Sequence, residues 1–431
     1  MNYNIDNLKH TIEASVSPFH TAKETICRLK KAGFTELSWE QPWNIEQNKK
    51  YYTCPFGTTV FAFRTGKCTD SDFSVKLASA HIDNPGLRIK YNPVLDSHHT
   101  QRLNVEVYGG AIYSSWFDRP LSIAGSVALK NSDSLFPQTK LIDFRQPVAV
   151  VPSLAIHLNR DANKGVAINP QTELLPVCGT NRDSPDNAFF MAQIASQLNE
   201  DPENILCYDL CLYNAEAPQY AGFEQEMLLA PRIDNLSSVQ ACLTGIIENE
   251  AEDGLQIIAL FDHEEIGSKS KNGANSSLLS FALERFCNAL GITRETFLKN
   301  LKKSCYLSLD VAHAINPNYP EKSDITTQLA LNQGFAVKCS AKHSYCSDSR
   351  TTGMILQLAG QNNIPCQPNY MRSDIPGGST VGPIVSSLLP MPCADIGIPI
   401  YAMHSAMETC GVRDQYYLEQ FMKTFFSTIL K

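Results

Sequence analysis

The sequence predicts an α/β fold in which a central sheet flanked by helices is split by an inserted, mainly β domain. Short apolar runs that end in titratable residues alternate with helical periodicity near both ends of the chain, as in residues 74–83 and 255–265. Between residues 92 and 222 the pattern changes to short alternating runs separated by turn residues. We therefore expect one domain built from residues 1–91 and 223–431, and a second built from residues 92–222.

The size and composition are those of a globular protein with more than one domain. The chain has 431 residues, of which 43% are hydrophobic and 19% are charged, and two domains are the natural expectation at this length. A net charge of -8 argues against nucleic acid or an anionic membrane as a partner, because both attract basic surfaces. Small molecules or peptides are the partners that we expect.

The cysteines and the N-terminus indicate a cytoplasmic protein. The 14 cysteines are dispersed without a Cys-x-x-Cys pair, and many lie in apolar runs, which is typical of reduced, buried thiols. The N-terminal residues MNYNID lack the basic and apolar regions of a secretory signal, and no apolar run approaches the length of a membrane span. We expect a cytoplasmic location and no membrane partner.

The first elements are two helices and two strands. Residues 5–33 have helical patterning that breaks at Ser17–Pro18, and Gly33 is placed to close the second helix. Residues 59–63 and 74–80 have the composition of strands.

The second strand runs directly into His81-Ile-Asp83. Because side chains alternate along a strand, His81 and Asp83 share a face, and Asp83 can hydrogen-bond the far imidazole nitrogen or the backbone around His81. Such support would fix one tautomer for metal ligation. A single histidine at a strand end is more often an ordinary residue with satisfied hydrogen bonds, so other residues must support this interpretation.

The inserted segment reads as antiparallel strands with one helix. Residues 103–107, 122–129 and 147–151 are expected strands, and residues 188–198 are an expected helix. His157 lies in an apolar run, and its own surroundings favour a buried histidine with satisfied hydrogen bonds.

A loop of the insertion contains Gly109, Gly110 and the run from Trp116 to Pro120. This loop is either a shaped edge near a ligand or only a tight corner.

The α/β alternation resumes with two acidic junctions. Asp234 stands just ahead of an expected helix over residues 236–248, where helix capping explains an acid as well as ligation does. The apolar strand 255–260 runs into four successive titratable residues, which include Glu264 and Glu265. Because an unpaired buried carboxylate costs several kcal/mol, a cation is expected there, with one carboxylate on a metal and its neighbour free for proton transfer. A solvated acidic turn is the alternative.

The last part of the chain supplies further strand ends. Strand 305–309 ends in Asp310, and His313 follows three residues later. Lys338 lies in a strand-like run, where a lysine is most often solvated, and a strand over residues 396–400 leads to His404. Helices are expected over residues 276–290, 293–302, 350–360 and 413–430. The glycine loop at residues 377–383 lacks the lysine and the spacing of a phosphate-binding loop.

Five residues at these junctions have the chemistry of a metal site. Two imidazoles and three carboxylates suit two hard-to-borderline ions, with one carboxylate bridging them and water completing the coordination. Glu264 is then left over as a base. The five residues are His81, Asp234, Glu265, Asp310 and His404.

These residues lie in motifs that resemble those of the aspartyl aminopeptidase family of co-catalytic zinc metallopeptidases. The motifs occur in the family's order across nearly the whole chain. They are SAHIDNP at residues 79–85, LAIHLNR at 154–160, RIDN at 232–235, DHEEIGS at 262–268, DVAHAINPNY at 310–319, GSTVGP at 378–383 and MHS at 403–405.

The resemblance implies a catalytic domain with a central mixed sheet, split by a dimerisation domain, in a cytosolic homo-oligomer that is a tetrahedral dodecamer. It implies two Zn²⁺ ions per subunit, although manganese or cobalt fits similar ligands. By position, Asp234 bridges the two ions. His81 and Asp310 complete one ion, and Glu265 and His404 complete the other.

The remaining implied roles concern the reaction and its substrate, a peptide with a free N-terminus. Glu264 is the general base and Asp83 a further catalytic residue. His313 and Lys338 bind substrate, with Lys338 pairing with an acidic side chain of the N-terminal residue. His157 reaches the active site of a neighbouring subunit, which reverses the interpretation from its own surroundings.

Three alternatives remain open. One is an aminopeptidase of broad or neutral preference, and another is a metal-dependent deacylase or carboxypeptidase on the same fold, because fold alone does not determine substrate. The third, from a different class, is a non-catalytic assembly or cargo-binding protein. The complete set of metal positions and the base argue against this third reading.

Overall fold

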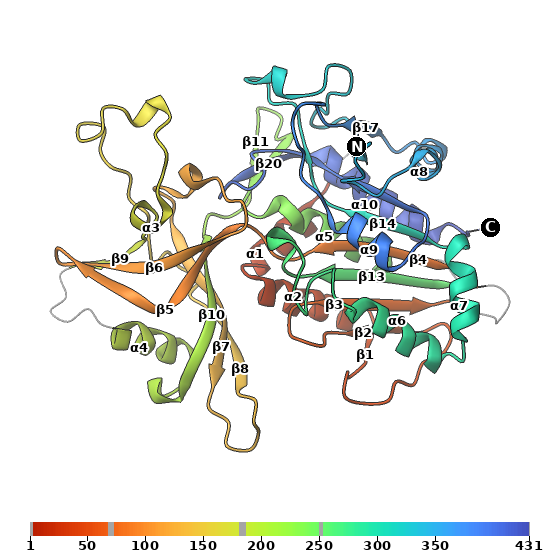
Figure 1. Ribbon diagram of the computed structural model, residues 1–431, viewed down its shortest axis with the longest axis horizontal. Helices are drawn as coiled ribbons and strands as arrows, with labels where there is room; N and C mark the ends of the chain where they lie inside the picture. The colour runs from red at the N-terminus through yellow and green to blue at the C-terminus, as the bar shows by residue number, and fades with distance from the viewer. Residues whose placement is uncertain (1–2, 68–72, 181–186, 250–252, 431) are drawn as a thin grey trace.

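The computed structural model describes residues 3–67, 73–180, 187–249 and 253–430 (Figure 1). Three sheets of nine, six and five strands organise these residues. In Figure 1 the nine-stranded sheet and its helices form one body, and the six-stranded sheet lies beside it at the left of the view. The fold is the expected α/β architecture with an inserted β domain.

The largest sheet is mixed, as expected. Its strands, in order across the sheet, are β1 (Thr35–Glu36), β2 (Lys50–Thr53), β3 (Val60–Thr65), β13 (Leu255–Phe261), β4 (Val75–His81), β14 (Cys305–Leu309), β18 (Cys393–Gly397), β16 (Phe335–Cys339) and β17 (Cys366–Tyr370). β13, β4 and β14 are neighbours in parallel, whereas β13 and β3 are antiparallel. The carboxyl ends of β13, β4 and β14 therefore lie at one edge of the sheet, which is where ligands bind in open α/β sheets.

Helices cover both faces of this sheet, so its central strands are apolar on both sides. Along β13, Ile258 and Leu260 belong to one core cluster, whereas Ile257 and Ala259 belong to another, because successive side chains of a strand point to opposite faces. The first cluster includes residues of α1 (Asp6–Ala14), α2 (Pro18–Lys31), α5 (Ile233–Ile247), α8 (Ser349–Gln361) and α10 (Val412–Ser427). The second cluster packs against α6 (Leu278–Ala289), α7 (Arg294–Asn300) and α9 (Val381–Leu388).

The inserted sheet is antiparallel and has its own core. Its strands, in order, are β8 (Gln138–Asp143), β7 (Leu121–Leu129), β10 (Ile205–Asn214), β5 (Gly86–Ser97), β6 (Thr100–Tyr108) and β9 (Val177–Thr180). Two helices accompany it, α3 (Pro170–Glu173) and α4 (Asn187–Leu198). The sheet starts at Gly86 and β10 ends at Asn214, and the expected domain boundaries at residues 92 and 222 stay a prediction.

The third sheet brings distant parts of the chain together. Its order is β11 (Gln219–Ala221), β12 (Met227–Ala230), β20 (Glu408–Gly411), β19 (Pro399–Tyr401) and β15 (Ala312–His313). β12 leads into the start of α5, and the loop between β19 and β20 carries His404. Asp234 and His404 are therefore both placed by this sheet.

One expected strand is wrong. Residues 147–151 form only isolated bridges, such as Leu121 with Ala149 and Val150 with Val177. Pro147 and Pro152 flank this run, and because proline lacks a backbone N–H the run cannot extend into a regular ladder. Within the ranges that the structure describes, no helix has the length and apolar character needed to cross a membrane.

Candidate metal centre and active site

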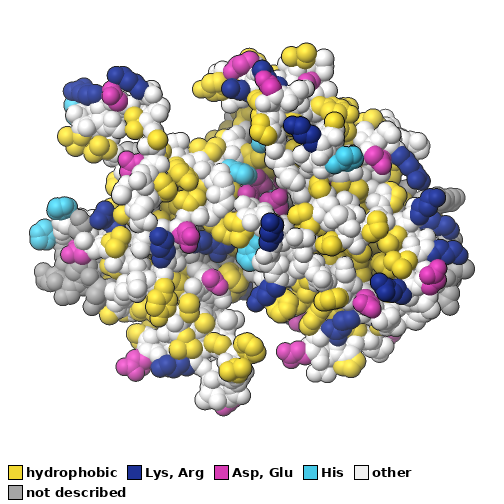
Figure 2. Space-filling model, viewed as in Figure 1, with side chains coloured by type: hydrophobic (Ala, Val, Ile, Leu, Met, Phe, Trp, Pro, Cys, Tyr) yellow, Lys and Arg dark blue, Asp and Glu magenta, His cyan; other side chains and the backbone are white. Residues whose placement is uncertain are grey.

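The ends of three parallel strands bring the predicted residues to one place. His81 is the last residue of β4 and stands opposite Phe261, the last residue of β13. Glu264 and Glu265 follow in a short 3₁₀ turn, Glu264–Ile266, and Asp310 directly follows β14. Figure 2 shows acidic side chains in a hollow near the centre of the visible face, with histidine side chains beside them.

Asp234 lies between the two histidines. Its Oδ1 is 3.3 Å from Nε2 of His81, and its Oδ2 is 3.4 Å from Nε2 of His404. The side chain is 3% exposed, and Oδ1 has no hydrogen-bond partner. Asp234 has non-helical backbone angles ahead of the regular part of α5, and among the described residues no backbone N–H donates to its side chain. The capping interpretation of this residue is therefore wrong.

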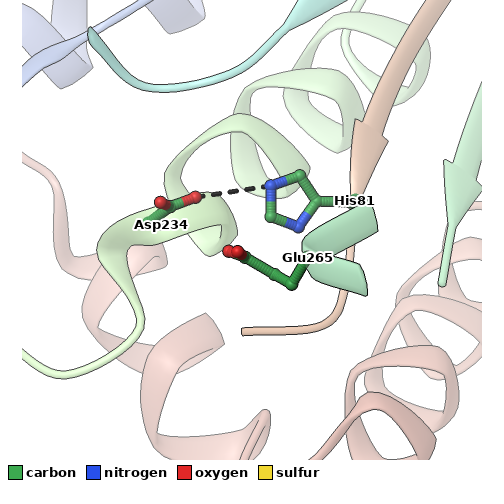
Figure 3. A group of neighbouring side chains, drawn as sticks. All are labelled: His81, Asp234 and Glu265. Carbon is green, nitrogen blue, oxygen red and sulfur yellow. Dashed lines mark ion pairs between the residues drawn. The ribbon is translucent and has the colours of Figure 1, made fainter. Parts of the chain in front are cut away.

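The five predicted ligands form two groups that share Asp234. In one group, Nε2 of His81 lies 3.7 Å from Oδ1 of Asp310. In the other, Nε2 of His404 lies 3.5 Å from Oε2 of Glu265. Ligand atoms of His81, Asp234 and Glu265 all lie within 4.8 Å of one another, and Figure 3 shows the polar ends of these three side chains facing one another.

The donor atoms fit a divalent metal ion. Imidazole nitrogen and carboxylate oxygen are zinc ligands, and two histidines with three carboxylates leave room for water or substrate. Burial, followed by the charge of Asp234, raises the pKa of the Glu265 carboxyl well above its ordinary value. Burial also acts to raise the pKa of Asp234, but the nearby imidazoles of His404 and His81 outweigh it and lower that pKa. Buried carboxylates packed this closely need positive charge, which a metal ion supplies.

Asp83 holds the two glutamates and His81 in place. Its Oδ1 and Oδ2 accept hydrogen bonds from the backbone N–H groups of Glu264 and Glu265, at 3.1 and 3.2 Å. Nδ1 of His81 lies 3.0 Å from the Asp83 carbonyl oxygen and 3.4 Å from its Oδ1. The hydroxyl of Tyr108 donates to Oδ2 at 2.7 Å. Because a carbonyl only accepts, Nδ1 of His81 carries the hydrogen and Nε2 is left free to bind a metal.

Glu264 has the environment of a general base. Burial raises the pKa of its carboxyl to about 7; the charge of Asp310 raises it further, whereas the charge of His81 acts in the opposite direction. A base with a pKa near neutral accepts and returns protons efficiently at neutral pH.

Lys338 is buried beside this cluster, so the expectation of a solvated lysine is wrong. It lies on β16, is 2% exposed, and its ammonium stands 5.1 Å from the ring centroid of Tyr345. Among the described residues its ammonium has no hydrogen bond and no ion pair. Burial lowers the pKa of Lys338, but the charge of Asp310 and other nearby negative charges outweigh burial and raise it. His313 lies nearby on β15 and is exposed; desolvation and the charge of Lys338 lower its pKa.

His157 is the one predicted site residue that the chain does not bring to the cluster. It is exposed in a turn where the backbone N–H groups of Leu158 and Asn159 donate to the carbonyl of Ala155. Leu154 and Leu158 are 58% and 76% exposed. The interpretation of His157 as buried is therefore wrong, because the apolar run faces outward and does not join the core of the insertion.

Glu408 belongs to the site although no sequence motif indicated it. This side chain is 2% exposed at the start of β20. Its Oε2 accepts a hydrogen bond from the backbone N–H of Asp234 at 2.9 Å, and its Oε1 accepts one from the backbone N–H of His404 at 2.8 Å. Burial and the charge of Asp234 raise its pKa well above the ordinary value. The available signal was a glutamate four residues after His404, just before a strand.

Comparison with known proteins shows what the chain is similar to. The family model described as aminopeptidase I zinc metalloprotease (M18) matches residues 11–426. A "Probable M18 family aminopeptidase 2" from Clostridium novyi (strain NT) is 41% identical over 419 residues, which are 96% of each chain. A chain in the cryo-EM structure of the Ape4 and Nbr1 complex is 29% identical with a TM-score of 0.93, covering 98% of this chain and 85% of that chain. The S. cerevisiae mApe1 dodecamer shares the fold at 24% identity, with a TM-score of 0.85 over 98% and 95% of the two chains.

Proposed function

This chain belongs to the aminopeptidase I zinc metalloprotease family, M18, and on that premise we propose that it releases N-terminal Asp or Glu from peptides with two zinc ions in its site. Aminopeptidase activity and zinc dependence are the properties of the family. The number of ions, the roles of individual residues and the acidic preference are parts of the proposal.

The observation that carries the two-ion proposal is the position of Asp234 between two histidines. Each of its oxygens faces a different imidazole, and each imidazole faces a further carboxylate. We assign Asp234 as the bridge, His81 with Asp310 to one ion, and His404 with Glu265 to the other. When bound, the ions would lower the pKa of water and polarise the carbonyl of the first peptide bond.

The proton transfers are assigned to Glu264. Its carboxylate would take the proton of the attacking water and return it to the leaving amine. Asp83 would keep Glu264 and Glu265 at the correct distance through their backbone N–H groups. His313 would stabilise the oxyanion that develops on the carbonyl.

The acidic preference is supported by the isolation of Lys338. A buried ammonium without an ion pair or hydrogen bond among the described residues is costly, and a substrate carboxylate would supply the missing partner. Asp310 and Asp234 offset the cost of burial by holding the lysine in its charged form. Lys338 would therefore bind the side chain of an N-terminal Asp or Glu.

We also propose that the chain forms a homo-oligomer, a tetrahedral dodecamer, in which His157 enters a neighbouring subunit's active site. The exposed apolar side chains around His157, among them Leu154, Leu158 and Val166, support an interface at this loop. The inserted domain that carries the loop would then be the dimerisation domain.

Initial rates on aminoacyl-p-nitroanilides with Asp, Glu, Leu, Ala and Lys test the function. We expect zinc-dependent release that is fastest for Asp and Glu, is lost after chelation, and falls by about 10²-fold or more in Glu264→Gln. Faster release of Leu or Ala would refute the acidic preference and leave the reaction standing. Absence of release from every substrate by the zinc-loaded protein would favour the non-catalytic alternative.

A further inference from the structure

Two consecutive glycines of the inserted domain lie against the metal cluster. Gly109 and Gly110 directly follow β6. A Cβ atom on Gly109, whose φ is +67°, would lie 3.1 Å from Cβ of Glu265. A Cβ atom on Gly110 would lie 3.3 Å from Nδ1 of His404. The sequence allows two interpretations of this loop, a tight corner or an edge near a ligand. The contacts with Glu265 and His404 show that it is an edge of the site.

The same segment orients His404 through hydrogen bonds. Nδ1 of His404 lies 3.1 Å from the carbonyl oxygen of Gly110. Because the carbonyl only accepts, Nδ1 carries the hydrogen, and Nε2 is left to face Asp234 and Glu265. A histidine held in this way has both its tautomer and its ring direction determined by the insertion.

Two further hydrogen bonds hold the loop that carries His404, and a third orders the inserted segment that makes them. The N–H of Ile112 donates to the His404 carbonyl at 3.0 Å. The N–H of Ala406 donates to Oγ of Ser115 at 2.9 Å, and the Ser115 hydroxyl donates to the Ile112 carbonyl at 2.6 Å. Ser115 therefore links the insertion to the loop between β19 and β20.

The other half of the cluster has a different support. Nδ1 of His81 lies against the carbonyl of Asp83, which follows the same catalytic strand. Among the described residues, no hydrogen bond joins the segment Gly109–Ser115 to His81 or Asp310. The segment Gly109–Ser115 thus lies against both unshared ligands of one proposed ion, Glu265 and His404, and within the described ranges it makes no hydrogen bond to the unshared ligands of the other.

We propose that the segment Gly109–Ser115 positions the ligands of one metal ion, the ion assigned to His404 and Glu265. This inference rests on the proposed two-ion site. It makes the two ions unequal: the ligand His81 is held by Asp83, which Tyr108 of the inserted sheet contacts, whereas the ligands of the second ion are contacted directly by the segment Gly109–Ser115. Weakening those contacts should therefore weaken one ion selectively.

Two substitutions and two matched controls test this inference. Gly110→Ala places a methyl group against the His404 ring, and Ser115→Ala removes the hydroxyl that joins the two loops. Ser114→Ala is the control for Ser115, because Ser114 is exposed in the same turn and has no side-chain hydrogen bond among the described residues. Gly353→Ala is the control for Gly110, because a Cβ there meets nothing within 4 Å.

The measurement is a titration of the chelator-stripped full chain with Zn²⁺ against a fluorescent chelator, which gives the number of ions and the Kd of each. We expect two ions in the wild type. In Gly110→Ala and Ser115→Ala, the Kd of one ion should rise about 10- to 100-fold, as is usual when the support of a metal ligand is lost. The Kd of the other ion, and both values in the controls, should change less than about twofold. Circular dichroism of the stripped variants checks that they remain folded.

Each other outcome has a defined meaning. Unchanged binding of both ions in Gly110→Ala and Ser115→Ala would overturn the inference, and so would equal weakening of both. If the wild type binds a single ion, the two-ion function fails. The inference is then decided by whether Gly110→Ala weakens that ion more than Gly353→Ala does.

Discussion

Replacement of Lys338 by methionine should remove the preference for acidic N-terminal residues. Methionine keeps most of the length of the side chain and its contact with Tyr345 but removes the charge. Lys338 is 2% exposed, so solvent screens its interaction with a substrate carboxylate only weakly. The charges of Asp310 and Asp234, which raise the pKa of the lysine, would then face an acidic substrate unopposed.

The size of the effect follows from the kind of contact that is lost. A hydrogen bond to a charged group contributes about 1.5–3 kcal/mol. At about 1.4 kcal/mol per tenfold change, this range corresponds to about 10- to 150-fold in the ratio of kcat/KM for acidic over neutral substrates. Because Lys338 is buried and Asp310 would repel an acidic substrate, we expect a change in this ratio in the upper half of the range.

The assay compares peptides that begin with Glu and with Gln, because these differ in charge and hardly in shape. In Lys338→Met the Glu-to-Gln ratio of kcat/KM should fall by the stated factor, while kcat/KM for Gln changes by less than about fivefold. Lys342→Met is the control, because Lys342 lies four residues further on and is exposed. An unchanged ratio in Lys338→Met would refute the assigned role of this lysine.

Three further substitutions test the support of the site and its assembly. Asp83→Asn replaces one of the two carboxylate oxygens that accept backbone N–H groups by an NH₂ group, which donates. This change should weaken zinc binding about 10- to 100-fold; unchanged zinc affinity and unchanged kcat would contradict the role of Asp83. Glu408→Gln should lower the free energy of unfolding of the zinc-free chain by about 1–3 kcal/mol, because one buried N–H loses its acceptor, and denaturant unfolding that matches the wild type would exclude this. His157→Ala should reduce kcat/KM with normal zinc content, and co-assembly with Glu264→Gln subunits should restore activity; a fully active His157→Ala protein would remove the proposed role across subunits.

The arrangement of the catalytic sheet could be predicted because local patterns coincide with the global fold. The apolar run of β13 ends where Glu264 and Glu265 begin, and the run of β4 ends at His81. Parallel strands that are apolar on both faces are found almost only in sheets covered by helices on both sides, and the carboxyl ends of such strands meet at one edge. His81, Glu265 and Asp310 could therefore be recognised at strand ends, whereas Asp234 and His404 stand at junctions that the third sheet places.

Glu408, which no motif indicated, and Gly110, whose role the sequence left open, act through contacts with the backbone. Glu408 accepts N–H groups from two distant segments, and Gly110 offers its carbonyl to His404. Neither contact depends on a pattern of side chains, so hydrophobic periodicity cannot predict either contact. The burial of Lys338 and the exposure of His157 were also hidden, because each depends on how separate elements pack. Contacts of this kind follow from tertiary structure and not from local sequence.

The hydrogen bonds of the acidic residues divide the cluster into two kinds of carboxylate. Asp83 and Glu408 each accept two backbone N–H groups, which supply partial positive charge and fix the position of the side chain. Asp234, Glu264, Glu265 and Asp310 accept no backbone N–H among the described residues, although they lie within the same buried region. Their charge has to be balanced by something else, because two histidines with a free Nε2 are neutral and Lys338 is a single cation. The carboxylates left without such donors are those assigned to the metal ions and to the base: Asp234, Glu265, Asp310 and Glu264.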